Sequence, residues 1–293
     1  MTHPLYVALV WHMHQPYYKD LRTGGMPMPW VRLHAAKDYL HMAEVLAQHP
    51  GVHATINMVP SLVEQMVAWA EGRESDDLVT IAEQERWSDA DRRFILQMCF
   101  SVNWDNIIRR YPRYAELLDR RPAALADPAA FSDADYRDLV AWFNLAWIDP
   151  GWLRRDPALH ALIEQGRDFS VADVQLIHAK QREIAGRVLP LYRKLAASGQ
   201  LEICTSPYFH PVLPLLIDTD CARAPSPGLP LPVPAYQAVE DAAAQLAAAV
   251  QAHTAAFGAP PAGLWPSEGG VSPAILPLVR EAGFRWLATD EII

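Results

Sequence analysis

The sequence is poor in cysteine and has no long apolar run. Its three cysteines, Cys99, Cys204 and Cys221, form no Cys-x-x-Cys pair and cannot all be paired with one another. This pattern does not build a disulfide framework and is typical of a reducing compartment, so we expect a cytoplasmic protein. No apolar segment is long enough to span a bilayer. The N-terminal stretch Met1–Trp11 lacks the basic residues and cleavage site of a secretion signal, and we expect no membrane partner.

Positive charge is also scarce. The 293 residues include 25 Lys and Arg against 34 Asp and Glu, which gives a net charge of −9. No stretch concentrates Lys and Arg with aromatic residues, so nucleic acid is not expected as a partner. The sequence contains no glycine-rich phosphate-binding motif and no internal repeat. With 51% hydrophobic residues, it is long enough for one large α/β barrel or two ordinary domains.

The first seventy residues alternate between strand and helix patterns. The apolar run Leu5–Trp11 predicts a strand buried on both faces of a parallel sheet. Val31–Gln48 has apolar residues at helical spacing, Val52–Val59 predicts a second strand, and Ser61–Trp69 predicts another helix. This order indicates a parallel sheet covered by helices.

The strand pattern stops between about residues 74 and 198, where the sequence predicts a large helical insertion. Ser88 and Ser132 are typical N-cap residues, because each precedes an acidic first turn. Prolines predict breaks between the helices at positions Pro112, Pro122, Pro128 and Pro150.

Strand patterns return after the insertion, at Leu201–Ser206, Ala262–Trp265 and Phe284–Thr289. Helices are predicted between them at Ala238–Phe257 and Pro273–Ala282.

Two local features of this C-terminal part carry further predictions. Ser272 is the expected N-cap of the helix that begins at Pro273. The proline-rich segment Val212–Tyr236 predicts an extended surface loop of the kind that often binds ligands.

Polar side chains lie at or near the ends of the predicted strands. Alternation along the first strand directs His12 and His14 to one side, where two imidazoles can bind a metal or a polar ligand. Glu202 lies inside a strand, while Glu268 and Asp290 follow two others. In parallel α/β folds this edge of the sheet is where ligands bind. Each residue alone also fits a structural role, such as a solvent-facing strand residue or a polar loop residue.

Five segments resemble the ordered motifs of glycoside hydrolase family 57, the group of α-amylases, amylopullulanases, 4-α-glucanotransferases and glycogen-branching enzymes. Each motif is short, but together they extend over most of the chain in the family's order. The segments are His12–Pro16, Gly199–Glu202, Thr205–Pro211, Trp265–Glu268 and Trp286–Glu291.

The resemblance implies a distorted seven-stranded (β/α) barrel with a large helical insertion and a retaining mechanism on α-glucans, without a metal or other cofactor. By the same likeness Glu268 would be the nucleophile and Asp290 the general acid/base. The residues that would bind substrate are His12, His14, Glu202, His210, Trp265 and Trp286.

Family members continue after the catalytic barrel into a helical region that supplies a further motif. No residues after Ile293 can supply it, so residues 1–293 are expected to be the catalytic barrel of a longer enzyme, without the C-terminal helical region. We expect this piece alone to be a poor catalyst, because little chain follows Asp290 to cover it.

Two other functions remain open. A metal-dependent carbohydrate deacetylase or mannosidase could hold Zn²⁺ through His12 and His14, although spacing reveals no third ligand. A non-catalytic glucan-binding module would also fit the many aromatic residues. Hydrolysis, transglycosylation and branching are equally compatible with the motifs, and the sequence predicts no oligomeric state.

Overall fold

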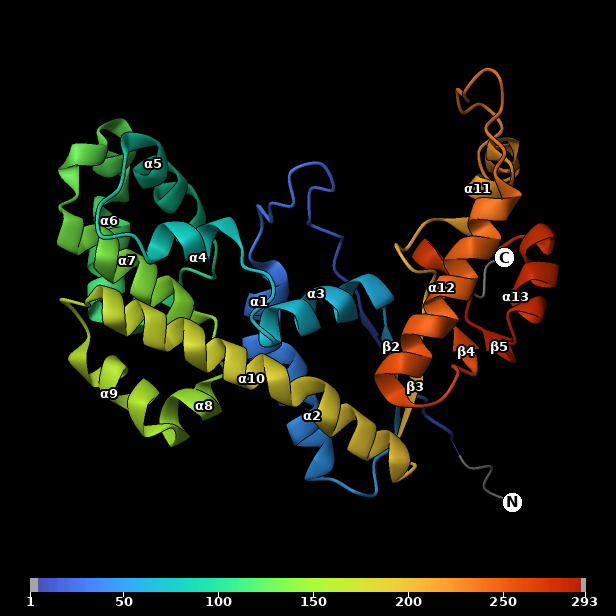
Figure 1. Ribbon diagram of the computed structural model, residues 1–293, viewed down its shortest axis with the longest axis horizontal. Helices are drawn as coiled ribbons and strands as arrows, with labels where there is room; N and C mark the ends of the chain where they lie inside the picture. The colour runs from blue at the N-terminus through green and yellow to red at the C-terminus, as the bar shows by residue number, and fades with distance from the viewer. Residues whose placement is uncertain (1–4, 291–293) are drawn as a thin grey trace. The chain divides into compact units, whose positions relative to one another are not determined.

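The structure is a computed structural model that describes residues 5–290. The chain, drawn in Figure 1, divides into two compact units. The first unit comprises Met1–Tyr17, Val45–Gln65 and Leu189–Ile293, and the second comprises Tyr18–Glu44 and Met66–Val188. The bounds of the predicted helical insertion, about residues 74–198, stay a prediction.

The first unit contains parallel strands in chain order. The first three strands pair as β1-β2-β3, and the last two pair as β4-β5. A parallel bridge between Thr205 and Leu264 connects the two groups, since Trp265 N donates to Thr205 O at 2.8 Å. The strands are β1 Val10–Met13, β2 Ala54–Met58, β3 Leu201–Cys204, β4 Gly263–Leu264 and β5 Trp286–Leu287.

The α/β class predicted from the sequence is confirmed. Residues 5–290 contain five strands that do not form a closed barrel, so the seven-stranded barrel remains a prediction.

The prediction for the first strand was wrong in its extent and burial. Strand β1 begins only at Val10, whereas Leu5 is 89% exposed and Trp11 is 51% exposed. The physical reason is position, because β1 is the end strand of the described sheet and pairs only with β2. Met13 is its buried residue, and the Tyr192 hydroxyl contacts the Met13 sulfur at 3.7 Å.

Helices that follow β3 and β4 form an apolar core with the second strand pair. Helix α12 (Val239–Phe257) and helix α13 (Leu276–Glu281) lie near β4 and β5, as Figure 1 shows. The core residues of this cluster are Leu213, Ala242, Leu246, Leu264, Ile275, Val279 and Phe284.

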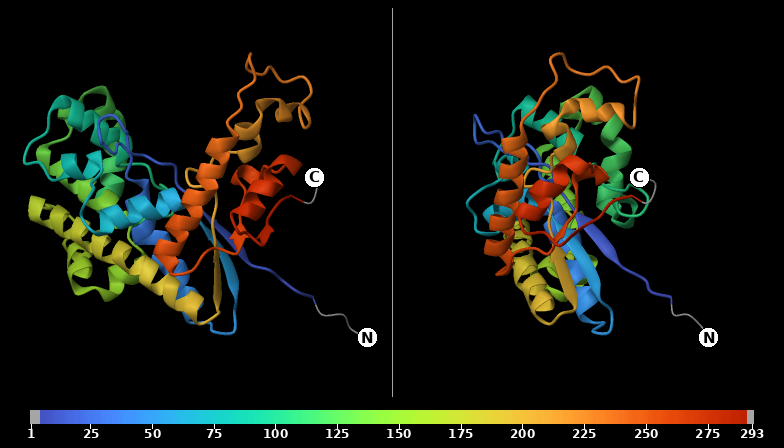
Figure 2. Two further views of the ribbon diagram at one scale, coloured as in Figure 1. Left: turned by 45° about the vertical axis from the view of Figure 1, so that its right-hand side comes forward. Right: turned by 90° about the vertical axis from the view of Figure 1, so that its right-hand side faces the viewer.

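The proline-rich segment is not wholly extended, contrary to the prediction. It contains helix α11 (Leu213–Ile217) and the 3-10 helix η4 (Thr219–Arg223). Pro214 lies in the first turn of α11, where a proline needs no backbone donor and its fixed φ suits the helix. The rest of the segment forms the loop that extends past the N-terminal end of α12 in Figure 2.

Ser272 occupies the N-cap position before Pro273, as the sequence predicts, but its side chain makes no capping hydrogen bond. The predicted helix begins as a 3-10 turn, η6 (Pro273–Ile275), before continuing as α13. In this tighter turn Ile275 N donates to the backbone oxygen of Ser272 at 3.2 Å. The Ser272 hydroxyl is buried and has no hydrogen-bond partner among the described residues.

The second unit is helical. Its first helix is continuous but changes type: α1 (Trp30–His34) passes into a π-helical turn, η1 (Ala35–Tyr39), and then into α2 (Leu40–Ala47). The prediction of a helix over Val31–Gln48 is therefore confirmed. Two of the further helices lie partly in the first unit: α3 (Pro60–Ala70), through residues 60–65, and α10 (Val171–Ala197), through residues 189–197. The others are α4 Asp77–Ala82, α5 Asp89–Met98, η2 Ile108–Arg110, α6 Pro112–Ala126, η3 Pro128–Ala130, α7 Asp133–Ala146, α8 Pro150–Arg155 and α9 Pro157–Gln165.

The predicted helix starts at Ser88 and Ser132 are confirmed. Each serine forms a reciprocal capping box with the aspartate three residues later, Asp91 or Asp135. The predicted break at Pro122 was wrong, because Pro122 lies inside α6. The other three prolines begin helices α6, η3 and α8, where the missing N–H costs nothing.

A buried charged network joins several helices of this unit. Arg32 on α1 donates to Asp76 at 2.8 Å and to Asn144 at 2.7 Å, and it also binds Gln181 on α10. Burying a guanidinium is costly unless its donors are paired, and these contacts provide the pairing.

The state of the cysteines and the composition of the helices bear on the predicted compartment. All three cysteines are free, and Cys99 and Cys204 are buried. In residues 5–290, no helix combines the length and apolar composition needed to cross a membrane. The cytoplasmic location stays a prediction.

Candidate active site

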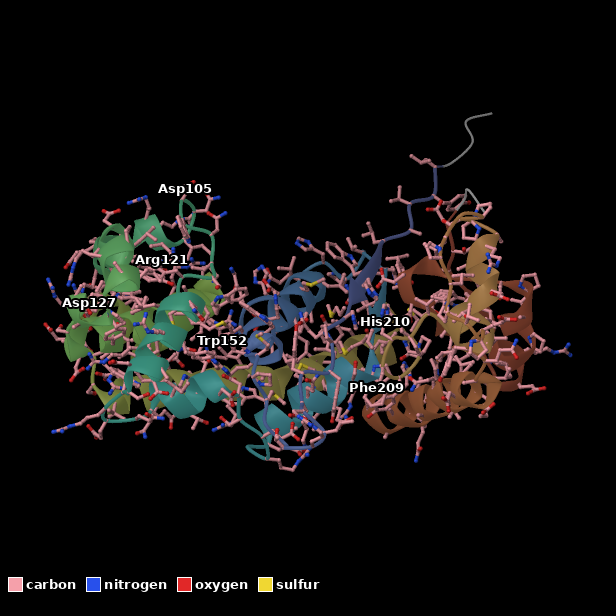
Figure 3. The ribbon with its side chains drawn as sticks, turned by 90° about the horizontal axis from the view of Figure 1, so that it is seen from above. Asp105, Arg121, Asp127, Trp152, Phe209 and His210 are labelled. Carbon is pink, nitrogen blue, oxygen red and sulfur yellow. The ribbon has the colours of Figure 1, made fainter. Side chains whose placement is uncertain are left out.

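Four aromatic rings meet where β1, β3 and β4 end. The rings of His12 and His14 stack at 5.9 Å between centroids, which confirms that they lie on one side of β1. His210, from the segment after β3, stacks on His14 at 4.0 Å and lies 5.3 Å from His12. Trp265, directly after β4, stacks on His12 at 5.1 Å. Figure 3 labels His210 and its neighbour Phe209. We call these four residues the histidine cluster.

A buried amide orients His12. Asn57 lies opposite His12 in the β1–β2 register, and its Oδ1 is 2.6 Å from His12 Nδ1. The same oxygen lies 3.3 Å from the Ser206 hydroxyl, which also donates to Trp265 O at 2.8 Å. With Asn57 Oδ1 as acceptor, His12 Nδ1 carries the proton, and in the neutral ring Nε2 is then a hydrogen-bond acceptor. Sequence reasoning missed Asn57 and Ser206, because which residue lies opposite His12 depends on the register between two strands.

Burial favours the uncharged imidazoles of His14 and His210 by lowering the pKa of each. The His210 side chain is only 4% exposed. Burial, followed by His14 and His12, lowers the pKa of His210 to about 4. The pKa of His14 is lowered by burial and by His12, while Glu268 acts in the opposite direction. His14 Nδ1 and His210 Nε2 are buried without hydrogen-bond partners among the described residues.

Glu268 reaches the cluster from a strained turn. It lies in the 3-10 turn η5 (Ser267–Gly269) with φ 54° and ψ 23°, the left-handed region. His210 also has a positive φ, 59°, and its Nδ1 lies 3.7 Å from Glu268 Oε1. Such a conformation costs a non-glycine residue roughly 1–2 kcal/mol. Strain of this kind gathers at functional sites. The Glu268 side chain is 75% exposed and therefore accessible to a ligand.

Asp290 leaves the sheet beside Glu268's strand. Strands β4 and β5 pair in parallel, with Gly263 opposite Trp286 and Leu264 opposite Leu287. Glu268 follows β4, and Asp290, which is exposed, follows β5. Both carboxylates therefore come after the carboxyl ends of neighbouring strands, as the sequence predicted. Glu291, the last residue of that motif, lies outside the described residues.

Glu202 and Trp286 form a separate pair. Trp286 Nε1 donates to Glu202 Oε1 at 2.9 Å. The indole crosses Gly263, where an added Cβ would lie 2.0 Å from the ring. Glu202 is opposite Thr55 in the β2–β3 register, two residues before the level of Asn57. The structure thus brings His12, His14, His210, Trp265 and Glu268 together, and it joins Glu202 to Trp286 at an earlier level of the sheet.

The histidine cluster does not have the arrangement of a metal site. The His14 and His210 rings are inclined by only 20°, so they stack face to face and their nitrogens do not converge on a point between them. Across residues 5–290, no group of three or more His, Cys, Asp or Glu residues has an arrangement that could hold a metal ion.

A second aromatic group borders the cluster and was not predicted. Phe209 is 48% exposed and packs edge-on against Tyr17 and Tyr208, at 5.1 Å and 4.7 Å between centroids. The two tyrosine hydroxyls donate to Glu64. An exposed ring held in this way can stack on a sugar face.

Comparison with solved structures finds distant matches. An α-amylase from Thermotoga maritima has a TM-score of 0.46 and 14% identity, covering 97% of this chain and 39% of that protein. A family 57 branching enzyme from Thermococcus kodakaraensis, in complex with glucose, has a TM-score of 0.44 and 18% identity, with coverages of 96% and 39%. A family 57-type branching enzyme from Pyrococcus horikoshii has a TM-score of 0.45 and 18% identity, with coverages of 96% and 40%.

The chain therefore spans about two fifths of the length of the solved proteins it matches, 39% and 40%. No curated protein matches its sequence. The sequence profile described as "Glycosyl hydrolase family 57" matches residues 8–292. Because this match covers nearly the whole chain, the protein belongs to glycosyl hydrolase family 57.

Proposed function

We propose that the chain carries the catalytic site of an enzyme that hydrolyses or transfers α-glucosidic bonds in starch, glycogen or maltooligosaccharides. The observation that supports this most directly is Glu268, held in a left-handed conformation 3.7 Å from His210 at the edge of the histidine cluster. Membership of a glycosyl hydrolase family makes a sugar the natural ligand of these groups.

In this proposal the two carboxyl groups divide the reaction. Glu268 attacks the anomeric carbon as the glycosidic bond breaks, and Asp290 gives its proton to the leaving oxygen. Water or a sugar hydroxyl then attacks the glycosyl-enzyme, while Asp290 takes back a proton. The anomeric configuration is retained, which requires the two carboxyl groups to be about 5–5.5 Å apart.

The cluster would bind the sugar beside Glu268. Trp265 would stack on a sugar face, and His14 Nδ1 and His210 Nε2, which are buried without partners among the described residues, would bond to hydroxyl groups. Trp286 and Glu202 would extend the same binding surface. The proposal includes no metal or cofactor, and it includes the family's closed seven-stranded barrel as the complete form of the sheet.

The replacement Glu268→Gln tests the nucleophile. The amide keeps the shape and hydrogen bonds but cannot form the glycosyl-enzyme, so we expect a loss of turnover greater than about a thousandfold. Binding of maltoheptaose should stay within a few-fold. Glu240→Gln, an exposed change on α12, is the control and should keep full activity. A Glu268→Gln variant that keeps more than a tenth of the rate would show that Glu268 is not the nucleophile.

The products identify the reaction. Maltoheptaose and pullulan would be incubated with the enzyme, and the products would be separated by size while the anomeric signal is followed by NMR. Shorter oligomers indicate hydrolysis, longer ones transfer, and new branch points branching. A first product of inverted configuration would contradict the proposed mechanism. Binding without turnover would instead favour a glucan-binding module, and loss of activity with a chelator would favour a metal-dependent enzyme.

A further inference from the structure

Helix α3 follows the middle strand of the first sheet and contacts the loops on both sides of it. Strand β2 lies between β1 and β3, and α3 begins two residues after β2 ends. Glu64 on this helix accepts a hydrogen bond from the Tyr17 hydroxyl through Oε1 at 2.8 Å. Its other oxygen, Oε2, accepts from the Tyr208 hydroxyl. Tyr17 belongs to the loop after β1, and Tyr208 to the loop after β3.

Two neighbours of Glu64 on α3 hold the same loops. Ser61 N donates to Tyr208 O at 3.2 Å, and the Ser61 hydroxyl donates to Gln15 O at 3.4 Å. Gln65 Nε2 donates to Pro16 O at 3.0 Å. Ser61 and Gln65 are each 1% exposed, so these bonds are shielded from water.

The two loops carry the stacked histidines. His14 comes three residues before Tyr17, and His210 comes two residues after Tyr208. Their rings are 4.0 Å apart although their strands are not neighbours in the sheet. The contact between the rings therefore depends on whatever fixes one loop against the other, and Glu64 is the side chain that bonds to both loops through their own side chains.

We propose that Glu64 is a positioning residue, which holds His14 and His210 face to face by accepting both tyrosine hydroxyls. The effect of Glu64 on turnover rests on the proposed function, whereas its effect on the two histidine rings does not. A carboxylate suits this role because it presents two acceptor oxygens to two donors, whereas a glutamine presents one. An aspartate is one methylene shorter and cannot reach both loops from the same backbone position.

The central experiment measures His210 directly, without substrate. The imidazole NMR signals of His210 would be titrated in the whole protein and in the variants Glu64→Ala and Tyr17→Phe. The groups that face His210 are His12 from β1, His14 from the loop after β1 and Glu268 from η5. In the native protein the pKa of His210 is about 4. Once Glu64 is removed, we expect the ring to gain solvent and its pKa to rise by about one unit or more.

A stability-matched control separates positioning from general loosening. Val279→Ala removes buried apolar atoms from the α12–α13 core of the same unit and leaves the hydrogen bonds of Glu64 in place. It should lower the free energy of unfolding but leave the His210 pKa unchanged. Tyr17→Phe removes one donor and keeps the ring, so it should raise the His210 pKa by less than Glu64→Ala does. This variant replaces Glu64→Ala in the experiment if Glu64→Ala does not fold.

Kinetics supply the second readout. Displacing the two histidines by about 1 Å should lower kcat/KM on maltoheptaose about 10- to 100-fold in Glu64→Ala, with Val279→Ala near the native value. An unchanged His210 pKa in a folded Glu64→Ala or Tyr17→Phe variant would overturn the proposal. A shifted pKa in an enzyme that proves inactive on every glucan would support the positioning role and defeat the proposed function instead.

Discussion

His210 couples the candidate site to the stability of the protein. Its pKa is about 4 in the folded chain, below the ordinary value of 6.5, so the unfolded chain binds more protons between these limits. We therefore expect stability to fall as the pH is lowered from about 6.5 toward 4, by up to about 3 kcal/mol from this residue.

Urea unfolding at several pH values between 7 and 4 measures this effect. The variant His210→Gln should show a flatter dependence than the native protein over this range. Equal slopes for the two proteins would mean that His210 titrates normally in the folded state.

Gly263 is required by the indole that lies over it. A methyl group at this position would meet the Trp286 ring at 2.0 Å, so Gly263→Ala must displace Trp286 and break its bond to Glu202. We expect a loss of about 1–3 kcal/mol in the free energy of unfolding. Gly186→Ala is the matched control, because the helical Gly186 has open space around it and should gain about 0.5–1 kcal/mol. A neutral Gly263→Ala variant would show that Trp286 can move at no cost.

At the scale of residues, the sequence predicted the candidate site residues better than the hydrogen bonds that orient them. Alternation along one strand was enough to place His12 and His14 together, because it is a local rule. Asn57 and Glu64 could not be found in the same way. The role of Asn57 depends on the register between two strands, and that of Glu64 depends on the direction in which a helix leaves the sheet.

Two serines that the sequence predicts as N-caps allow a test at the scale of helices. Ser132 accepts from Asp135 N and caps α7, whereas the Ser272 hydroxyl is buried without a partner among the described residues. We expect Ser132→Ala to cost about 1 kcal/mol of unfolding free energy. Ser272→Ala should be neutral or slightly stabilising, because it removes a buried polar group that makes no bond. Thermal unfolding of both variants measures the difference, and equal losses would refute the distinction.

The error in the first predicted strand comes from context that another part of the chain supplies. A continuous apolar run such as Leu5–Trp11 predicts burial, but an end strand with one partner leaves part of it exposed. Prolines predict breaks, yet Pro122 lies within α6 and Pro214 within the first turn of α11. The serine caps at Ser88 and Ser132 were predictable because a capping box involves only four consecutive residues.

For the whole molecule, the order of strand and helix patterns was sufficient to predict a parallel α/β sheet. Closure of a barrel was beyond such reasoning, because it depends on the tilt and stagger of strands relative to each other. The ordered motifs led to glycoside hydrolase family 57, and the match over residues 8–292 confirms that family.

The net charge of −9 gives a prediction for the molecule as a whole. A protein without a basic surface releases few counterions from a polyanion, so it should bind neither heparin nor DNA at about 0.1 M salt. If the protein binds neither polymer, it will appear in the flow-through of a heparin column and will not shift labelled DNA in a gel. Retention that weakens as salt is added would reveal a basic patch that the overall charge conceals.

The π-helical turn at Ala35–Tyr39 has a consequence for how this chain tolerates changes in length. A π turn accommodates one residue more than the α-helical turns on either side, between α1 and α2. Deleting one residue from an ordinary helix rotates everything beyond it by about 100°, because each residue occupies that share of a turn. Here a deletion of one residue would convert the π-helical turn into an ordinary α-helical turn. The residues before and after it would then keep the same faces of the helix. Natural variants that are one residue shorter are therefore expected within Ala35–Tyr39 more readily than elsewhere in this helix.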